Sequence, residues 1–449
     1  MKLIYIIYDI LLLILFMLYL PVLLYKMIVK GKYREGILER FGFLAAEKIE
    51  QFEGQPTIWV HAVSVGETVA ASAVVTEVKE RYPEHKILFS TVTDTGQGMA
   101  RQIVKEADET IYFPLDFSWV VGRALSKINP EVVILTETEL WPNFIRLAKE
   151  NEAKIMLANG RISDSSFAGY KYLGPILKDM LANVDLFSMQ SEQDLEYIQS
   201  LGAEQTKVYN NGNTKFDQDY AQPDSSKEEE LYQVFKLNKE QPILVVGSTH
   251  PNEEEQLLPL YQKLKDEFPE LVMILAPRHI KRASEVESLY QQAGIKTVLR
   301  TEIETRDPSQ DSVIILDTIG ELAQIYGIAD LVFVGGSLIE KGGHNILEPA
   351  VHGKLVFFGP YMFNFKANTR LVLDYGVGIQ IEDVAELTEE MLYYLKNEDE
   401  LKKKGRQAVQ MIEDNQGAAE RNAKLVKKII DSKVRFESGS ANAINKEGL

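Results

Sequence analysis

The chain has 449 residues, enough for two or three domains, and 45% of them are hydrophobic, which supports large buried cores. Its formal net charge of -17 argues against nucleic-acid binding, because contacts with phosphate groups need a basic surface. The absence of cysteine excludes disulfides, thiolate metal ligands and cysteine nucleophiles, and the six histidines show no metal-binding spacing, so we expect no metal site.

An apolar segment opens the chain and predicts a membrane anchor at residues 1–25. Between Leu3 and Tyr25 the only charged residue is Asp9, and a stretch of this length can cross a bilayer. Basic residues follow it: Lys26, Lys30, Lys32, Arg34 and Arg40. By the positive-inside rule they place the rest of the chain on the cytoplasmic side of the membrane.

Two alternatives to a membrane-spanning anchor fit the same segment. A cleaved signal peptide fits poorly, because the basic cluster follows the apolar run and no Ala-x-Ala cleavage site comes after it. A helix that lies in the membrane interface is favoured by the polar groups of Tyr5, Tyr8, Asp9 and Tyr19. Either membrane arrangement tethers the rest of the chain to a lipid surface.

Short apolar runs alternate with amphipathic stretches from Pro56 onward, a pattern typical of parallel, doubly wound α/β sheets. The first set of predicted strands is Thr57–Ala62, Lys86–Ser90, Thr110–Phe113, Val132–Leu135, Lys154–Ala158, Leu186–Met189 and Lys207–Tyr209. The second set is Pro242–Gly247, Leu271–Leu275, Val313–Leu316, Leu331–Val334 and Leu355–Phe358.

Six segments follow from this pattern. They are the anchor at 1–25, a Rossmann-like domain at 26–217, a polar linker at 218–240, a second Rossmann-like domain at 241–400, a C-terminal helix at 401–432 and a polar tail at 433–449. Two Rossmann-like domains facing each other across a cleft form the GT-B architecture of many glycosyltransferases. The same pattern also fits epimerases and periplasmic-binding-protein-like folds.

The first candidate site lies where a predicted strand runs into a predicted helix. Ile58-Trp59-Val60 is typical of a strand, a small-residue turn follows, and Glu67 stands in the first helical turn. A helix N-terminus after a strand commonly binds a small anion, and here the turn carries a potential base. We therefore expect proton abstraction beside an anionic ligand. The alternative is a solvated carboxylate that complements the helix dipole.

Two further clusters fall at predicted strand ends of the same domain. Glu137 and Glu139 follow the strand Val132–Leu135, a position at the mouth of a sheet. Helix capping is the better explanation for Glu139, whereas Glu137 is the better candidate for the site. Lys215, in the segment Asn211–Asp217, is expected to face the cleft between the domains, although an ordinary Asn-Gly turn with a surface lysine fits equally well.

The second predicted domain carries glycine-rich turns and polar segments at successive strand ends. They are Gly247–His250, Ala276–His279, Asp317–Leu322, Gly335–Ser337 and Gly342–Pro349. Turns that enter helix N-termini supply backbone N–H groups for phosphate, and Arg278 adds a planar donor. Glu348 can accept hydrogen bonds from two ribose hydroxyls. Each glycine pair alone is weak evidence, because turns need glycine anyway, but together they predict a phosphate site.

These motifs together resemble the 3-deoxy-D-manno-octulosonic acid (Kdo) transferases that act on lipid A precursors. The resemblance covers nearly the whole chain and is specific because its motifs are many and ordered. They are HAVSVGE (61–67), STVTDTG (90–96), TETELWPN (136–143), NGRISDSS (159–166), GNTKFD (212–217), STHPNEE (248–254), PRH (277–279), DTIGEL (317–322) and GGSLIEKGGHNILEPA (335–350).

The resemblance implies an inverting GT-B transferase that moves Kdo from CMP-Kdo to a lipid A precursor, lipid IVA, in lipopolysaccharide core biosynthesis. It implies that Glu67 is the proton acceptor and that Glu137 and Lys215 stabilise the transition state. The implied CMP-binding residues are Pro277, Arg278, Ile319, Gly320, Glu321, Asn345, Ile346, Leu347 and Glu348. No cofactor is implied besides the donor CMP-Kdo. The implied partners are the lipid A precursor and membrane lipids, on the cytoplasmic side of the inner membrane.

Two other classes of function fit parts of the same pattern. Another sugar-nucleotide enzyme on a similar two-domain fold, such as an epimerase, has no use for the N-terminal helix and prefers uridine nucleotides. A non-catalytic, membrane-tethered binding module has no need for Glu67, although its nucleotide pocket persists.

Overall fold

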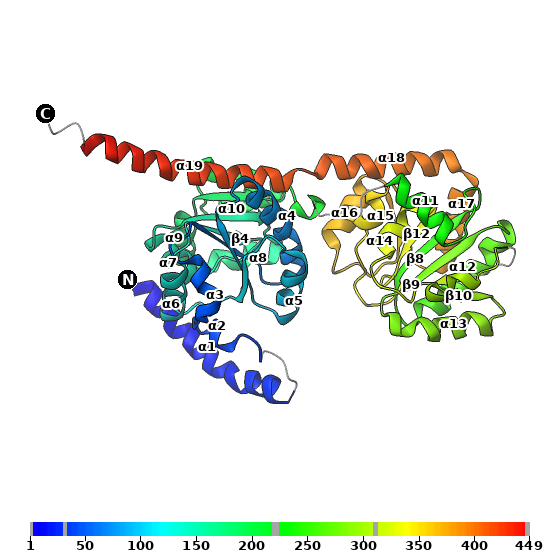
Figure 1. Ribbon diagram of the computed structural model, residues 1–449, viewed down its shortest axis with the longest axis horizontal. Coiled ribbons are helices and arrows are strands. Elements are labelled where there is room, and N and C mark those ends of the chain that lie inside the picture. Colours follow the sequence, from blue (N-terminus) through cyan, green and yellow to red (C-terminus); the bar gives the residue numbers. More distant parts are fainter. Residues whose placement is uncertain (1–2, 30–33, 218–223, 309–312, 445–449) are drawn as a thin grey trace. The chain divides into compact units, whose positions relative to one another are not determined.

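The computed structural model describes residues 3–29, 34–217, 224–308 and 313–444 and divides into two compact units (Figure 1). Unit 1 is Met1–Gln218 together with Asn415–Leu449, and unit 2 is Asp219–Asp414. Each unit is built around one seven-stranded sheet in which every strand pair is parallel. The two doubly wound α/β sheets that the sequence predicts are therefore confirmed.

The sheet of unit 1 has the order β3-β2-β1-β4-β5-β6-β7. Its strands are β1 (Thr57–His61), β2 (Lys86–Thr91), β3 (Glu109–Tyr112), β4 (Val132–Thr136), β5 (Lys154–Gly160), β6 (Leu186–Met189) and β7 (Val208–Asn210). The order reverses between β1 and β4, which lie side by side with Val60 opposite Ile134. In a doubly wound sheet, ligands bind outside the carboxyl ends of the strands at such a reversal.

Apolar side chains on both faces of this sheet explain why its strands are continuous hydrophobic runs. Ile58 and Val60 of β1 pack with one set of helices, and Trp59 between them packs with the set on the opposite face.

The helices are α1 (Leu3–Ile28), α2 (Ile37–Arg40), α3 (Ala46–Ile49), α4 (Val65–Arg81), α5 (Asp94–Ile103), α6 (Ser118–Ile128), α7 (Pro142–Glu150), α8 (Asp164–Tyr170), α9 (Gly174–Asn183), α10 (Glu192–Ser200) and α19 (Ala418–Ile444). Four 3₁₀ helices complete the unit: η1 (Glu50–Phe52), η2 (Lys171–Leu173), η3 (Gln205–Lys207) and η4 (Thr214–Asp217).

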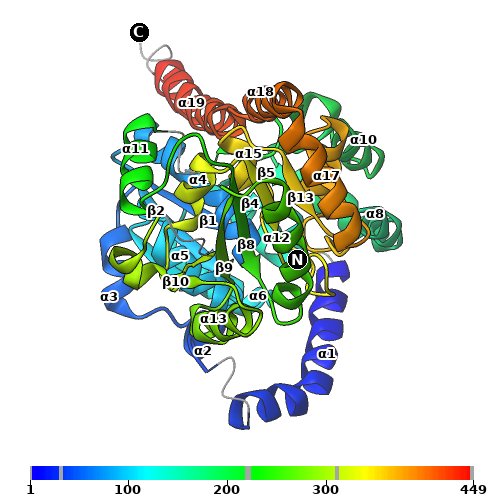
Figure 2. The same cartoon turned by 90° about the vertical axis from the view of Figure 1, so that its right-hand side faces the viewer.

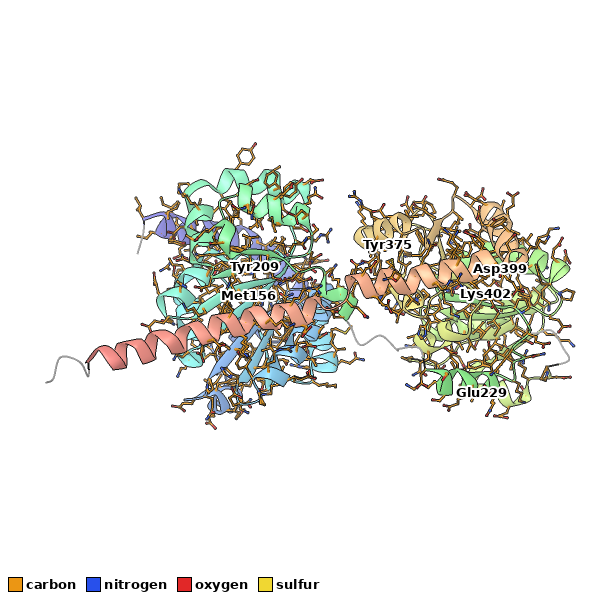
Figure 3. The ribbon with its side chains drawn as sticks, turned by 90° about the horizontal axis from the view of Figure 1, so that it is seen from above. Met156, Tyr209, Glu229, Tyr375, Asp399 and Lys402 are labelled. Carbon is orange, nitrogen blue, oxygen red and sulfur yellow. The ribbon has the colours of Figure 1, made fainter. Side chains whose placement is uncertain are left out.

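The C-terminal helix α19 returns to unit 1 and covers one face of its sheet. Its residue Ala423 is fully buried in the same core cluster as Met156 of β5, and its Lys428 donates to the Tyr209 hydroxyl at 2.7 Å (Figure 3). The carboxylate of Asp217 accepts the backbone N–H groups of Gly417 and Ala419 at 2.5 and 2.6 Å, so it caps the start of α19.

The sheet of unit 2 has the order β10-β11-β9-β8-β12-β13-β14 and reverses between β8 and β12. Figure 2 shows β8 and β9, two neighbours in this sheet, side by side. Its strands are β8 (Ile243–Thr249), β9 (Val272–Pro277), β10 (Thr297–Leu299), β11 (Val313–Ile315), β12 (Leu331–Val334), β13 (Val356–Phe358) and β14 (Gly378–Gln380). Its helices are α11 (Ser225–Val234), α12 (Glu253–Glu267), α13 (Ala283–Gln292), α14 (Leu322–Ile325), α15 (Leu347–Val351), α16 (Lys366–Asp374), α17 (Val384–Lys396) and α18 (Glu398–Asn415), with the 3₁₀ helices η5 (Ile280–Arg282), η6 (Arg300–Thr305) and η7 (Tyr326–Ile328).

All twelve strands predicted from the sequence are present, and no strand end shifts by more than two residues. The strands β10 and β14 were not predicted, because each is a three-residue strand at one edge of its sheet and lacks a continuous apolar run. The predicted linker contains the helix α11, and its residues 218–223 lie outside the described residues. The segment predicted as a C-terminal helix at 401–432 is divided between α18 and α19 near Gly417, which has a φ of 83°.

Helix α1 is long and apolar enough to cross a membrane, with 26 residues and a mean hydropathy of 2.6 in its most apolar window. One side of its first turns nevertheless packs against unit 1. The buried carboxylate of Asp9 accepts hydrogen bonds from Asn143 Nδ2 at 2.7 Å and from the Ser118 backbone N–H at 3.1 Å. The described part of unit 1 therefore includes this helix as a packed element.

We expect Asp9→Ala to lower the free energy of unfolding of unit 1 by about 1–3 kcal/mol, because it leaves the partly buried Ser118 N–H without its acceptor. All three tryptophans of the chain, Trp59, Trp119 and Trp141, lie in unit 1, so tryptophan fluorescence during denaturation in detergent reports this unit. Leu15→Ala is the control, because its side chain on the same helix is exposed, and it should change stability by less than about 0.5 kcal/mol. Equal effects of both variants would contradict the packing role of Asp9.

Candidate functional site

The sheet order of unit 1 brings Glu67 and Glu137 to one place. Glu67 lies in the first turn of α4, after β1, and Glu137 directly follows β4. Because β1 and β4 are neighbours at the point where the strand order reverses, both carboxylates stand outside the same edge of the sheet.

Glu67 is bound back onto the turn that precedes it. Its Oε2 accepts the Val63 backbone N–H at 2.6 Å, and its Oε1 accepts the Ser64 hydroxyl at 3.1 Å. The pKa of Glu67 is raised to about 7, because burial and, to a smaller extent, the charge of Glu137 outweigh the lowering effect of these hydrogen bonds and of Lys215. A carboxyl with a pKa near neutrality can take up and release a proton at physiological pH, unlike the solvated helix-start carboxylate of the alternative interpretation.

Glu137 and Lys215 form an ion pair, with Lys215 Nζ 2.7 Å from Glu137 Oε1. Glu137 has a φ of 55°, a left-handed conformation that is uncommon outside glycine and often marks functional sites. The segment that carries Lys215 is held by Thr214, whose backbone N–H donates to Asn159 Oδ1 at 2.9 Å. The Lys215 side chain is only about a quarter exposed. The alternative interpretation, a surface lysine on an ordinary Asn-Gly turn, is therefore wrong.

The sequence-based explanation of Glu139 as a helix cap is wrong. Helix α7 begins at Pro142, its N-cap residue is Trp141, and no side chain caps it. Burial and the nearby Glu67 instead raise the pKa of Glu139 to about 8, so this third carboxyl belongs to the same cluster. The only signal in the sequence is proximity, because Glu137 and Glu139 stand two residues apart in the short segment between β4 and α7.

In unit 2, several predicted nucleotide-binding residues gather outside the carboxyl ends of β8, β9 and β12. Arg278 is exposed and follows β9, which ends at the buried Pro277. Asn345 Nδ2 donates to Glu348 Oε1 at 3.2 Å. Burial raises the pKa of Glu348, while the Asn345 hydrogen bond and the charge of Arg278 lower it, so Arg278 and Glu348 share one electrostatic environment.

The remaining predicted residues have different surroundings. Ile346 and Leu347 are fully buried. Ile319 is 81% exposed, and Gly320 has a φ of 93°. Glu321 Oε1 pairs with Arg300 Nη2 at 2.7 Å.

Two histidines that the sequence argument did not assign lie beside Arg278. The Nε2 atoms of His250 and His344 are 2.9 Å apart, and their rings are stacked with centroids separated by 5.2 Å. Burial and, to a smaller extent, the charge of Arg278 lower the pKa of His344 to about 4, so this ring is neutral at physiological pH. The only sequence signal was that each histidine stands inside a candidate motif.

The glycine-rich turn Gly335–Ser337 is not open to phosphate, which corrects the sequence-based expectation. The buried carboxylate of Glu253 accepts the backbone N–H groups of Gly336 at 2.7 Å and of Ser337 and Leu338 at 3.0 Å. The protein's own anion therefore takes the donors that a phosphate needs.

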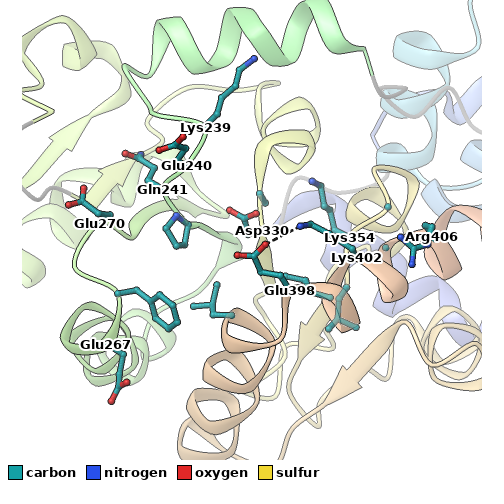
Figure 4. A pocket seen from close by; sticks show the side chains of 18 of the residues that line it. Lys239, Glu240, Gln241, Glu267, Glu270, Asp330, Lys354, Glu398, Lys402 and Arg406 are labelled. Atoms are coloured by element: carbon teal, nitrogen blue, oxygen red, sulfur yellow. Dashed lines mark hydrogen bonds and ion pairs between the residues drawn. The ribbon is translucent and has the colours of Figure 1, made fainter.

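A pocket of about 1040 Å³ lies elsewhere in unit 2 (Figure 4). Its wall includes Pro242, Asp330 and Leu355, which precede β8, β12 and β13, so it opens at the amino ends of the strands. Ligands of doubly wound sheets bind at the carboxyl ends, where Arg278 and Glu348 lie. The size of this pocket is therefore a poorer guide to the site than the polar residues at the opposite edge.

A family model and a curated relative of this chain carry the same transferase description. A family model described as 3-deoxy-D-manno-octulosonic-acid transferase (kdotransferase) matches residues 35–218. The chain is 35% identical over 384 residues to a bifunctional glycosyltransferase/methyltransferase of Fusobacterium nucleatum, an alignment that covers 84% of this chain but only 58% of that protein. It is 30% identical over 405 residues to the 3-deoxy-D-manno-octulosonic acid transferase of Haemophilus influenzae, covering 90% of this chain and 93% of that one.

A solved structure supports the fold. UDP-GlcNAc 2-epimerase of Neisseria meningitidis, bound to UDP-GlcNAc, is similar with a TM-score of 0.57 over 84% of this chain and 100% of that one. The sequence identity is 9%, so this likeness concerns the fold alone. The predicted GT-B architecture, with its N-terminal apolar helix, agrees with the two doubly wound sheets.

We expect the stability of Glu67→Gln, measured relative to the unchanged protein, to increase as the pH rises from about 4.5 to 7. In the unfolded chain Glu67 ionises near its ordinary pKa of 4.5, but in the folded chain only near 7, so the unchanged protein loses stability across this window. Glutamine does not ionise, and a shift of this size corresponds to at most about 3 kcal/mol.

Denaturation at pH 5 and pH 8, followed by tryptophan fluorescence, measures this difference. Glu80→Gln is the control, because Glu80 is an exposed carboxylate on the same helix α4. A Glu67→Gln gain that is the same at both pH values would contradict the raised pKa of Glu67.

Proposed function

We propose a specific reaction for this chain, which belongs to the 3-deoxy-D-manno-octulosonic acid (Kdo) transferase family and is therefore a glycosyltransferase. It transfers Kdo from CMP-Kdo to a lipid A precursor, lipid IVA, with inversion at the anomeric carbon, in lipopolysaccharide core biosynthesis. The observation that carries the proposal is the Glu67 carboxyl beside the Glu137–Lys215 ion pair. A base next to a held cation suits the attack of a hydroxyl on an acidic sugar.

Glu67 is the proposed proton acceptor. An acceptor sugar hydroxyl has a very high pKa and must lose its proton as its oxygen bonds to the anomeric carbon of Kdo. At the same time the bond from that carbon to the CMP phosphate oxygen breaks, and CMP leaves with the electron pair. A pKa near 7 leaves a useful share of Glu67 ionised in the cytoplasm while keeping it basic enough to take the proton.

Lys215 and Glu137 are the proposed transition-state stabilisers. The Lys215 ammonium group stabilises negative charge on the Kdo carboxylate and on the departing phosphate, because a cation in a half-buried site is poorly screened by water. Glu137 holds the ammonium group in place at 2.7 Å and offsets part of its charge, so no uncompensated cation is buried before the substrates bind.

Unit 2 is the proposed site for the CMP part of the donor. Arg278 binds the phosphate with its planar fork of donors, and Glu348 accepts the ribose hydroxyls. The other proposed contacts come from Pro277, Ile319, Gly320, Glu321, Asn345, Ile346 and Leu347. The exposure of Arg278 and its electrostatic link to Glu348 support this assignment.

We place the protein at the cytoplasmic face of the inner membrane. The apolar helix α1 and the basic residues that follow it support this location. Tethering suits a lipid acceptor, because it raises the effective concentration of the enzyme at the surface where the acceptor lies.

CMP should raise the melting temperature of the full chain, and UDP should raise it much less. At about 100 times its Kd a ligand stabilises the native state by about 2.7 kcal/mol. Arg278→Ala and Glu348→Ala should each reduce the CMP shift, whereas Arg370→Ala, an exposed arginine on α16 of the same unit, should leave it unchanged. Equal stabilisation by UDP would favour an epimerase-like enzyme instead.

Glu67→Gln should keep the fold and the CMP-induced shift in melting temperature but lose transfer by about 10² to 10⁴-fold. Glutamine has the same shape and can still hydrogen-bond, but it cannot accept the proton. The assay supplies radiolabelled lipid A precursor, CTP, Kdo and a CMP-Kdo synthetase, and it measures Kdo addition. Glu80→Gln on the same helix is the control and should transfer at the normal rate. A Glu67→Gln rate above about a tenth of normal would contradict the assignment of Glu67 as proton acceptor, since loss of a general base lowers the rate by more than about tenfold.

A further inference from the structure

The N-terminal end of helix α1 is fixed to the catalytic unit by polar contacts. The Tyr5 hydroxyl donates to Asp179 Oδ2 at 2.8 Å, and the Tyr8 hydroxyl donates to Asp116 Oδ2 at 3.0 Å. The buried Asp9 adds its bonds to Ser118 and Asn143. Every partner in these contacts belongs to unit 1.

The chain beyond the C-terminal end of α1 is fixed to the same unit. The Glu39 carboxylate accepts the Tyr112 backbone N–H at 2.8 Å, and Arg40 Nη1 donates to the Val92 carbonyl at 2.8 Å. Tyr112 ends strand β3, and Val92 follows strand β2, so both partners lie on the sheet that carries the candidate site.

These two attachments conflict with a membrane-spanning helix. A helix of 26 residues is about 39 Å long at 1.5 Å per residue, and the hydrocarbon core of a bilayer is about 30 Å thick. If α1 crossed the bilayer, its two ends would lie on opposite faces, and one folded unit cannot bind both. A spanning α1 would also place Asp9 within the hydrocarbon without its Ser118 and Asn143 partners.

We propose that α1 does not cross the membrane but lies against unit 1 and inserts its exposed face into the cytoplasmic leaflet. The chain would then be monotopic, with its N-terminus on the same side as the candidate active site. This inference rests on the membrane location proposed above and not on the transfer reaction.

The exposed surface around α1 fits a lipid leaflet with anionic headgroups. Leu11, Leu15 and Leu18 share one side of the helix, and each is more than half exposed. Phe16 on the side that meets the unit makes edge contacts with Phe41 and Phe117, at centroid distances of 6.2 and 6.0 Å. The helix is therefore continuous with aromatic side chains of the unit itself.

Those aromatic side chains lead to residues typical of a membrane interface. Phe117 stacks on Trp119 with a centroid distance of 4.8 Å, and Trp119 is half exposed. The Arg123 guanidinium lies 4.0 Å from the ring centroid of the exposed Phe43 and also donates to the Phe41 carbonyl. Exposed Trp and Phe rings beside a guanidinium suit the level of the headgroups, where the rings enter the lipid and the cation meets phosphate.

Cross-linking tests the docked position of α1. Because the chain contains no cysteine, only the introduced thiols can react. Tyr5→Cys combined with Asp179→Cys is treated with a short bismaleimide in native membranes, and the linked peptides are identified by mass spectrometry. The matched control combines Leu15→Cys with Asp179→Cys, since Leu15 is exposed and lies ten residues, about 15 Å, further along the helix. We expect the first pair to cross-link in most molecules and the control pair in few. A first pair that cross-links no better than the control overturns the proposal.

The side on which the N-terminus lies is tested independently with single cysteines. Leu3→Cys and Tyr172→Cys place one thiol each at exposed positions of unit 1, at the start of α1 and in η2. A membrane-impermeant maleimide is added to right-side-out and to inverted vesicles. We expect both thiols to react only in inverted vesicles. Reaction of Leu3→Cys in right-side-out vesicles overturns the proposal, and neither test depends on Kdo transfer.

Discussion

The ion pair between Lys215 and Glu137 is the interaction on which the candidate site of unit 1 depends, because it joins two segments that are distant in the sheet. Strand β7 lies three positions from β4 in the sheet, so the short helix η4 must cross the ends of β5 and β6 for Lys215 to reach Glu137. Thr214 holds this crossing through Asn159 near the end of β5 and through the Ala70 carbonyl of α4. Asp217, at the other end of η4, caps α19. Four residues thus join the site to the helix that completes the core.

The same ion pair controls the charge of the site. Glu67, Glu137 and Glu139 bring three carboxyl groups together in a largely buried place, where the charge of Glu137 raises the pKa of Glu67 and the charge of Glu67 raises the pKa of Glu139. Lys215 counteracts this effect and lowers the pKa of Glu67. With Glu67 near 7 and Glu139 near 8, the cluster holds carboxyls in different protonation states at neutral pH. The proton transfer proposed for Glu67 needs such a balance.

In unit 2, the composition of a sequence motif does not by itself show which groups its residues contact. Gly335–Ser337 has the composition of a phosphate-binding turn, yet its backbone N–H groups donate to Glu253. The residues next to this turn in the sequence do not indicate that contact. Arg278 and Glu348 are 70 positions apart in the numbering but share one environment, because β9 and β12 flank β8 in the sheet. The stacked pair His250 and His344 arises in the same way. Such pairings depend on strand order, which apolar periodicity does not encode.

The sequence by itself determined the elements and the candidate groups of this protein. Continuous apolar runs predicted twelve of the fourteen strands, since strands buried on both faces need them, and Glu67, Glu137 and Lys215 stood out at strand ends. Only the tertiary structure decided which of these groups meet, that Glu139 joins them, and that α1 packs through Tyr5 and Asp9. The physical reason is that pKa values, ion pairs and helix docking depend on burial and on partners distant in sequence, whereas periodicity is local.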